Sequence, residues 1–307
     1  MFELSQYFLF AGTILVAVAL LAKIVAFSRE RTPALDETHA GHAASRRGGV
    51  ALADRPEVAT PENGHGAGSG EARGLMWYSS RMVWVAFAFL TISLVLRAVV
   101  TGHGPFTNQH EYAVSFSWGI LLCYLWFERQ YKARTLALLV LPVATGLLLY
   151  SLAMDTEVRP LVPALQNNWL LSLHVATAVI AYGAACISFA AAVLFLIRPH
   201  IKWRGLPSRE VLDEMGYRGA VLCYPMLTAM LILGAIWADI AWGRYWSWDP
   251  KETASLVTWL IYSGYLHARV VRDWRGNKAA YLLIIGFAAV LFTYFGNHFL
   301  GGMHSYA

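Results

Sequence analysis

Residues 242–252 read W-G-R-Y-W-S-W-D-P-K-E, and apolar runs at 219–240 and 250–271 lie on either side. Each run is long enough to cross a bilayer, which takes about 20 predominantly apolar residues. Trp242, Trp246 and Trp248 therefore stand in a short polar loop between two membrane helices. Tryptophan is enriched at membrane interfaces, so an aromatic belt is one interpretation of the loop. An aromatic belt requires neither a fixed spacing of its tryptophans nor a glycine nor an acidic residue. The pattern W-G-x-x-W-x-W-D therefore favours a binding function.

The acidic end of this loop has a structural interpretation of its own. Asp249, Pro250 and Glu252 form a capping-box sequence with proline at the first helical position. This predicts a helix that begins at residue 250. Capping accounts for the carboxylates and leaves the three tryptophans unexplained.

The composition is that of a membrane protein. Hydrophobic residues make up 57% of the chain and charged residues 14%, whereas charged residues are about a quarter of a soluble domain. We predict an all-α, polytopic helical bundle with about eight transmembrane helices. The expected spans are 7–27, 80–100, 113–127, 135–153, 169–197, 219–240, 250–271 and 279–300.

The predicted domain organisation has three parts. Residues 1–27 form the first transmembrane helix, and residues 80–307 form the main membrane domain, with its tryptophan loop at 241–252. Residues 28–79 are expected to be a disordered cytoplasmic loop, because this segment is mostly small, polar and charged and cannot bury enough apolar surface to order itself.

Lys and Arg predict the orientation, because cytoplasmic loops carry them in excess. Of the 24 such residues, all but Arg97, Arg159, Arg244 and Lys251 fall on one predicted side. That side is assigned to the cytoplasm of a cell that carries the chain in its plasma membrane, so both termini and the tryptophan loop face outward. The net charge of +5 then reflects topology, and we expect a lipid bilayer and no nucleic acid as a partner.

Three histidines are candidates for metal binding. His174 and His304 flank the tryptophan loop from separate segments, while His267 lies towards the cytoplasmic end of its helix. A lone membrane histidine can equally serve as a helix–helix hydrogen bond. Two imidazoles beside a sheet of indoles suit haem, whose iron binds imidazole, and Arg244 or Lys251 could pair with the propionates. His103, His110 and His298 are further candidates.

Several segments together resemble one protein family. The stretch W-G-R-Y-W-S-W-D-P-K-E-T at 242–253 is similar to the "WWD" signature of haem-handling proteins of cytochrome c maturation. The segments I-Y-S-G-Y-L-H-A-R at 261–269 and G-G-M-H-S-Y at 301–306 resemble the later histidine motifs of that family. The turn G-H-G-P at 102–105, with Asn108 and Glu111, resembles its CcsA/ResC-type branch.

The resemblance implies a membrane subunit of a cytochrome c synthase, a haem lyase complex with a CcsB/ResB-type partner. Its haem-handling domain would move haem b, held transiently as substrate, to the outer face and present it to the CXXCH motif of apocytochrome c. His174 and His304 would ligate the outer haem iron, beside the loop with its tryptophans, Arg244 and Asp249. His267 would ligate an inner haem whose second ligand comes from the partner. The alternatives are a haem exporter without attachment activity and a non-catalytic membrane scaffold.

Overall fold

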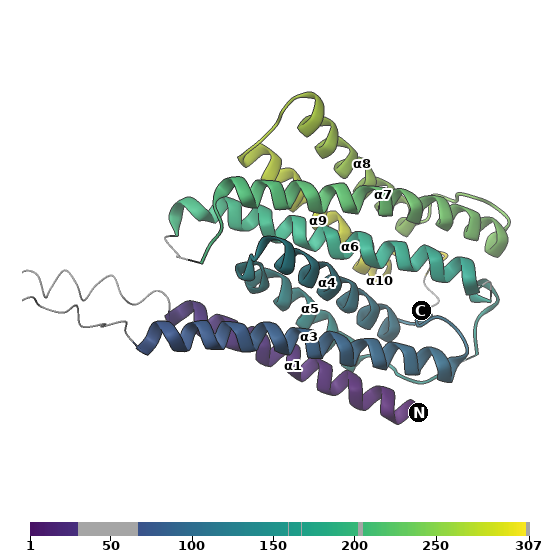
Figure 1. Ribbon diagram of the computed structural model, residues 1–307. Helices are drawn as coiled ribbons and strands as arrows, with labels where there is room; N and C mark the ends of the chain where they lie inside the picture. Colours follow the sequence, from purple (N-terminus) through teal and green to yellow (C-terminus); the bar gives the residue numbers. More distant parts are fainter. Residues whose placement is uncertain (30–66, 159, 167, 202–204, 305–307) are drawn as a thin grey trace, which may run out of the picture.

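The computed structural model describes residues 1–29, 67–158, 160–166, 168–201 and 205–304, and within these ranges the chain is helical without strands. Eight long helices form one bundle (Figure 1). They are α1 (Phe2–Arg29), α3 (Ala67–Thr101), α4 (Gln109–Tyr131), α5 (Ala137–Ala153), α6 (Asn168–Ile197), α7 (Arg209–Trp242), α8 (Pro250–Val271) and α9 (Asn277–Phe295). The short helix α10 (Asn297–Leu300) follows α9.

The predicted fold class is confirmed. Among the described residues, 6 of these helices are long and apolar enough to cross a membrane. The other two are α4 and α8, which are less apolar overall but pack within the same bundle. The start of α1 lies at the same end of the bundle as the loop between α7 and α8 (Figure 1), and His304, the last described residue, contacts Asp249 of that loop. We call this end of the bundle the tryptophan-loop end.

The first two helices pack against each other along much of their length. Helix α3 begins at Ala67, earlier than the predicted end of the loop at residue 79. The extension has a packing reason, because Met76 is buried against Ala26 and Phe27 of α1. The remainder of the predicted cytoplasmic loop, residues 30–66, lies outside the described residues.

Helix α6 is the centre of the bundle and contacts α4, α7 and α9. Glycines permit its closest crossing, with α4. A Cβ atom at Gly183 of α6 would lie 2.5 Å from the carbonyl oxygen of Gly119 of α4. Small residues at such crossings let membrane helices approach until their backbones touch. This tight centre fixes the N-terminal turns of α4 and α6, which carry part of the site described next.

Candidate functional site

A cleft opens at the tryptophan-loop end of the bundle. Its walls come from α4, α6, α7, α8 and α9 and from the chain that follows α10. Small-molecule sites are mostly apolar with a few placed polar groups. The lining includes Tyr112, Phe116, His174, Tyr182, Trp237, Trp246, Lys251, Tyr294 and His304.

His174 reaches the cleft from the second turn of α6. Its Nδ1 lies 2.8 Å from the carbonyl oxygen of Met230 in α7. A carbonyl oxygen only accepts hydrogen bonds, so Nδ1 carries the proton and the lone pair lies on Nε2. Gly234 makes room for the ring, since a Cβ atom there would lie 2.7 Å from Cε1 of His174. The helix pair thus fixes both the position and the tautomer of this imidazole.

His304 is held by the tryptophan loop itself. Its Nδ1 lies 2.8 Å from Oδ2 of Asp249, and the other oxygen of Asp249 accepts the backbone N–H of Met303 at 2.5 Å. Gly302 has φ +128°, and a Cβ atom there would overlap Oδ1 of Asp249. Burial lowers the pKa of His304 and outweighs the hydrogen bond that its ring donates to Asp249, which raises the pKa. The ring is therefore neutral at pH 7, with its proton on the nitrogen that faces the carboxylate.

Asp249 has two roles, of which the sequence reveals one. It caps α8 in a capping box with Glu252, which confirms the predicted start of this helix at Pro250. It also orients His304. Burial raises the pKa of Asp249, but the hydrogen bonds that its carboxylate accepts from His304, Met303 and Lys251 bring it below its usual value. A carboxylate behind an imidazole is the arrangement that typically orients a metal-ligating histidine.

Trp237 and Trp242 contact the two imidazoles, and Trp246 lines the same cleft. Trp237 is 2% exposed and stacks on His174 with ring centroids 6.4 Å apart and planes 9° apart. The same indole lies 5.9 Å from the His304 ring, and Trp242 meets that ring edge-on at 4.9 Å. Trp246 lines the cleft.

Trp248 differs from the other predicted tryptophans. It is 69% exposed, with its ring 5.7 Å from that of Trp246. Trp237 was not predicted, because in the sequence it is one more apolar residue of the helix before the loop. Its spacing of five residues from Trp242 is the one hint that the sequence offers.

The two candidate cations lie differently. Arg244 is exposed and is not among the described residues that line the cleft, whereas Lys251 is. The Lys251 ammonium lies 5.5 Å from the centroid of the Tyr112 ring. Nearby, the hydroxyl of Tyr294 is buried without a hydrogen-bond partner among the described residues. The cleft thus offers one ammonium and one hydroxyl donor to a ligand with an anionic edge.

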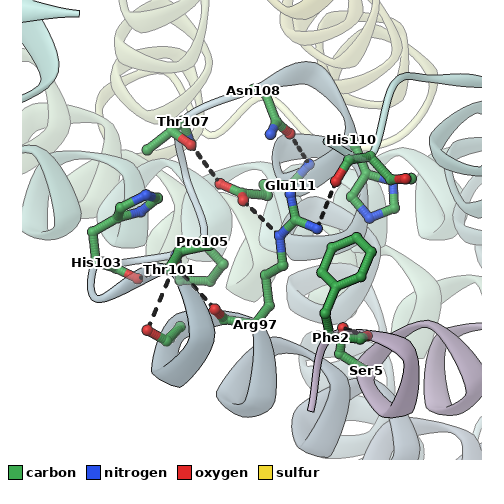
Figure 2. Close-up of polar contacts among 12 residues, drawn as sticks. Phe2, Ser5, Arg97, Thr101, His103, Pro105, Thr107, Asn108, His110 and Glu111 are labelled. Carbon is green, nitrogen blue, oxygen red and sulfur yellow. Dashed lines mark hydrogen bonds and ion pairs between the residues drawn. The ribbon is translucent and has the colours of Figure 1, made fainter. Parts of the chain in front are cut away.

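His103, His110, His200 and His267 do not line this cleft. His267 lies on an exposed face of α8. His103 and His110 are in the α3–α4 region, where their Nδ1 atoms lie 2.9 Å from the carbonyl oxygens of Gly104 and Ser151 (Figure 2). The side chain of His298 lies outside the described residues.

A buried ion pair organises the region around His103 (Figure 2). Nε of Arg97 lies 2.9 Å from Oε1 of Glu111, with both side chains at most 4% exposed. The other oxygen of Glu111 accepts the N–H and the hydroxyl of Thr107, and Arg97 also donates to the carbonyl of Thr156. This network fixes the first turn of α4, which supplies Tyr112 to the cleft.

Comparison with known proteins identifies the family. The family model "Cytochrome C assembly protein" matches residues 107–304, about two thirds of the chain and all of the cleft. The chain belongs to this family. It is 35% identical over 249 residues to the cytochrome c biogenesis protein CcsA of Guillardia theta, covering 71% of this chain and 82% of that protein. It is 37% identical over 238 residues to CcsA of Chlamydomonas reinhardtii, covering 73% and 67%.

A solved structure has the same fold. The protein named cytochrome c haem lyase CcmF superposes with a TM-score of 0.57 at 21% identity, covering 94% of this chain. The chain spans 46% of the length of that protein. The family places this chain in cytochrome c biogenesis, and the shared fold extends over nearly the whole bundle.

Proposed function

We propose that this chain binds haem between His174 and His304 and presents it for covalent attachment to apocytochrome c. The observation that carries the proposal is the state of the two imidazoles. Each has its Nδ1 engaged, by Met230 and by Asp249, so each directs its lone pair through Nε2. They come from different elements and line one cleft with aromatic walls. Two neutral imidazoles on one cleft suit the two axial positions of haem iron.

The rest of the cleft fits the remainder of a porphyrin. Trp237, Trp242 and Trp246 supply flat apolar surface, and Trp248 lies at the exposed rim. Lys251 is positioned to pair with one propionate, and Arg244 is available at the rim for a haem edge that extends out of the cleft.

The chain would act by positioning rather than by acid–base chemistry. Apocytochrome c offers the two thiols of its CXXCH motif to the two haem vinyl groups. Each S–H adds across one vinyl double bond, so that a C–S bond forms, the hydrogen goes to the other vinyl carbon, and no external oxidant or reductant is needed. The histidine of the motif then replaces one of the two imidazoles on iron. Holding the reacting groups in the correct orientation is itself a large part of catalysis.

His267 would serve an earlier step. Its exposed position on α8, away from the cleft, suits an inner haem site completed by a second histidine from a CcsB/ResB-type partner. With the cleft on the outer side of the plasma membrane, haem b would pass from His267 to the pair His174 and His304. The chain would then be one subunit of a holocytochrome c synthase.

Co-expression tests the proposal. The chain and its partner are produced with a c-type apocytochrome, and covalent haem is scored on a denaturing gel. We expect attachment with the wild type and its loss in His174→Ala and His304→Ala. Normal attachment in the double variant would contradict the proposal. A wild type that carries haem outward but yields no covalent product would favour an exporter instead.

A further inference from the structure

A second pocket lies at the end of the bundle opposite the tryptophan loop. It has a volume of about 720 Å³ and opens between the end of α1, the start of α3, the end of α4 and the 3-10 turn η2 (Arg134–Leu136). It shares no lining residue with the cleft. This basic pocket has no part in the function proposed above.

The lining of the basic pocket has a strong excess of positive charge. Arg81, Arg129, Lys132 and Arg134 line it, and Glu128 is the one acid among its described lining residues. All four cations are exposed. A positive-inside distribution explains basic residues at this end of the molecule, but it does not require that four of them converge on one hollow.

The negative charge of Glu128 is already balanced by a buried lysine of this protein. Glu128 lies 3.5 Å from Nζ of Lys23, a lysine that is 0% exposed, and 3.8 Å from Nε of Arg134. It also accepts a hydrogen bond from Ser80. Because the buried Lys23 offsets this carboxylate, the field of the other cations reaches the pocket largely uncancelled.

One of these cations occupies an unfavourable backbone position. Lys132 ends α4 in the left-handed conformation with φ +52°. Glycine adopts this conformation without steric cost, whereas other residues lose about 1–2 kcal/mol there. A lysine at this position therefore adds a charge where the backbone alone would favour glycine.

Indole rings complete the pocket at the level of a membrane surface. Trp77 and Trp84 are 47% and 45% exposed, and the guanidinium of Arg81 lies 5.0 Å from the Trp77 ring centroid. Such half-exposed tryptophans are typical of the headgroup region of a bilayer. Cations and indoles together suit a ligand with an anionic head and an apolar body.

We propose that the basic pocket binds the phosphate headgroup of an anionic phospholipid. Basic pockets between membrane helices on the cytoplasmic side recognise such headgroups, and anionic lipids are concentrated in that leaflet. Haem is also anionic at one edge, but the described lining contains no imidazole for its iron. The four cations match phosphodiester oxygens, and the indoles match the glycerol and upper acyl region.

Native mass spectrometry of the full-length protein tests this site. The protein is released from nanodiscs of phosphatidylglycerol and phosphatidylethanolamine, and the retained lipid is identified. The pocket variant is Arg129→Gln with Lys132→Gly, which leaves Arg134 beside Glu128 and suits the left-handed turn. The control, Arg272→Gln with Arg275→Gln, removes the same charge from exposed positions that do not line the pocket.

We expect wild type and control to retain phosphatidylglycerol in preference to phosphatidylethanolamine. The pocket variant should bind it about 30-fold more weakly, from roughly fivefold for each removed cation. The proposal would be overturned if the pocket variant and the control lost phosphatidylglycerol binding equally. It would also be overturned if the wild type showed no preference for phosphatidylglycerol. So would displacement of the lipid by inorganic phosphate alone, or a haem spectrum that only the pocket variant loses. Because this readout is independent of cytochrome c attachment, it can fail without affecting the proposed function.

Discussion

Replacing Asp249 with Asn should separate helix capping from haem binding. Asn and Asp are about equally good N-caps, so α8 should start as before. The contact with His304, at 2.8 Å, changes instead. Oδ2 of Asp249 also accepts the capping N–H of Lys251, so the amide oxygen of the variant keeps that place and its contact with His304 loses the negative charge. The amide NH₂ then faces the N–H of Met303, which has lost its acceptor, and the segment that carries His304 is displaced.

The size of this effect follows from the contact. A hydrogen bond to a charged group contributes roughly 1.5–3 kcal/mol, and loss of such a partner typically weakens metal binding about 10–100-fold. We expect haem affinity to fall within that range and the low-spin spectrum of the purified protein to weaken. Haem titration of purified Asp249→Asn measures both. Ser208→Ala is the control, because Ser208 caps α7 and does not line the cleft. Wild-type affinity and spectrum in Asp249→Asn would refute the proposed role of the carboxylate.

Three further predictions concern the same cleft. Gly234→Ala should displace His174, since the new Cβ would lie 2.7 Å from its ring. Low-spin haem should then be lost while far-ultraviolet circular dichroism stays unchanged, and an unaltered haem spectrum would contradict this. Lys251→Gln should weaken haem binding roughly fivefold to tenfold, because one partly buried ion-pair partner is lost. Arg244→Gln should weaken it less, and equal effects of the two substitutions in a haem titration would contradict the proposed role of Lys251. Acidification should release haem with a midpoint below about pH 6.5, the ordinary histidine pKa. The reason is that burial lowers the pKa of His304 and only the neutral ring binds iron. A midpoint above that pH in a spectrophotometric titration would contradict the assignment.

The helices were predictable because each apolar run has to satisfy its own backbone in a bilayer. The run predicted at 169–197 matches α6 to within a residue. The predicted helix boundaries were wrong where a cap or packing extends a helix into polar sequence. Helix α7 begins at Arg209, ten residues before the predicted apolar run, because the cap at Ser208 starts it within the polar segment.

The site was predictable in its parts but not in its connections. The motifs single out His304 and the tryptophans, and its predicted position beside the loop singles out His174, but the contact between Asp249 and His304 spans 55 residues of chain. Local patterns explain Asp249 fully as a cap, so they contain no signal for its second role. Trp237 and Gly234 likewise look like ordinary helix residues until α6 and α7 pack together.

The central claim is that His174 and His304 together hold the haem. Absorption and electron paramagnetic resonance spectroscopy of the haem-titrated protein, purified without its partner so that the inner site lacks its second imidazole, test it most directly. We predict a low-spin, bis-imidazole signal from the cleft that disappears in His174→Ala and in His304→Ala and persists in His267→Ala. Retention of that signal in the His174→Ala, His304→Ala double variant would contradict the account.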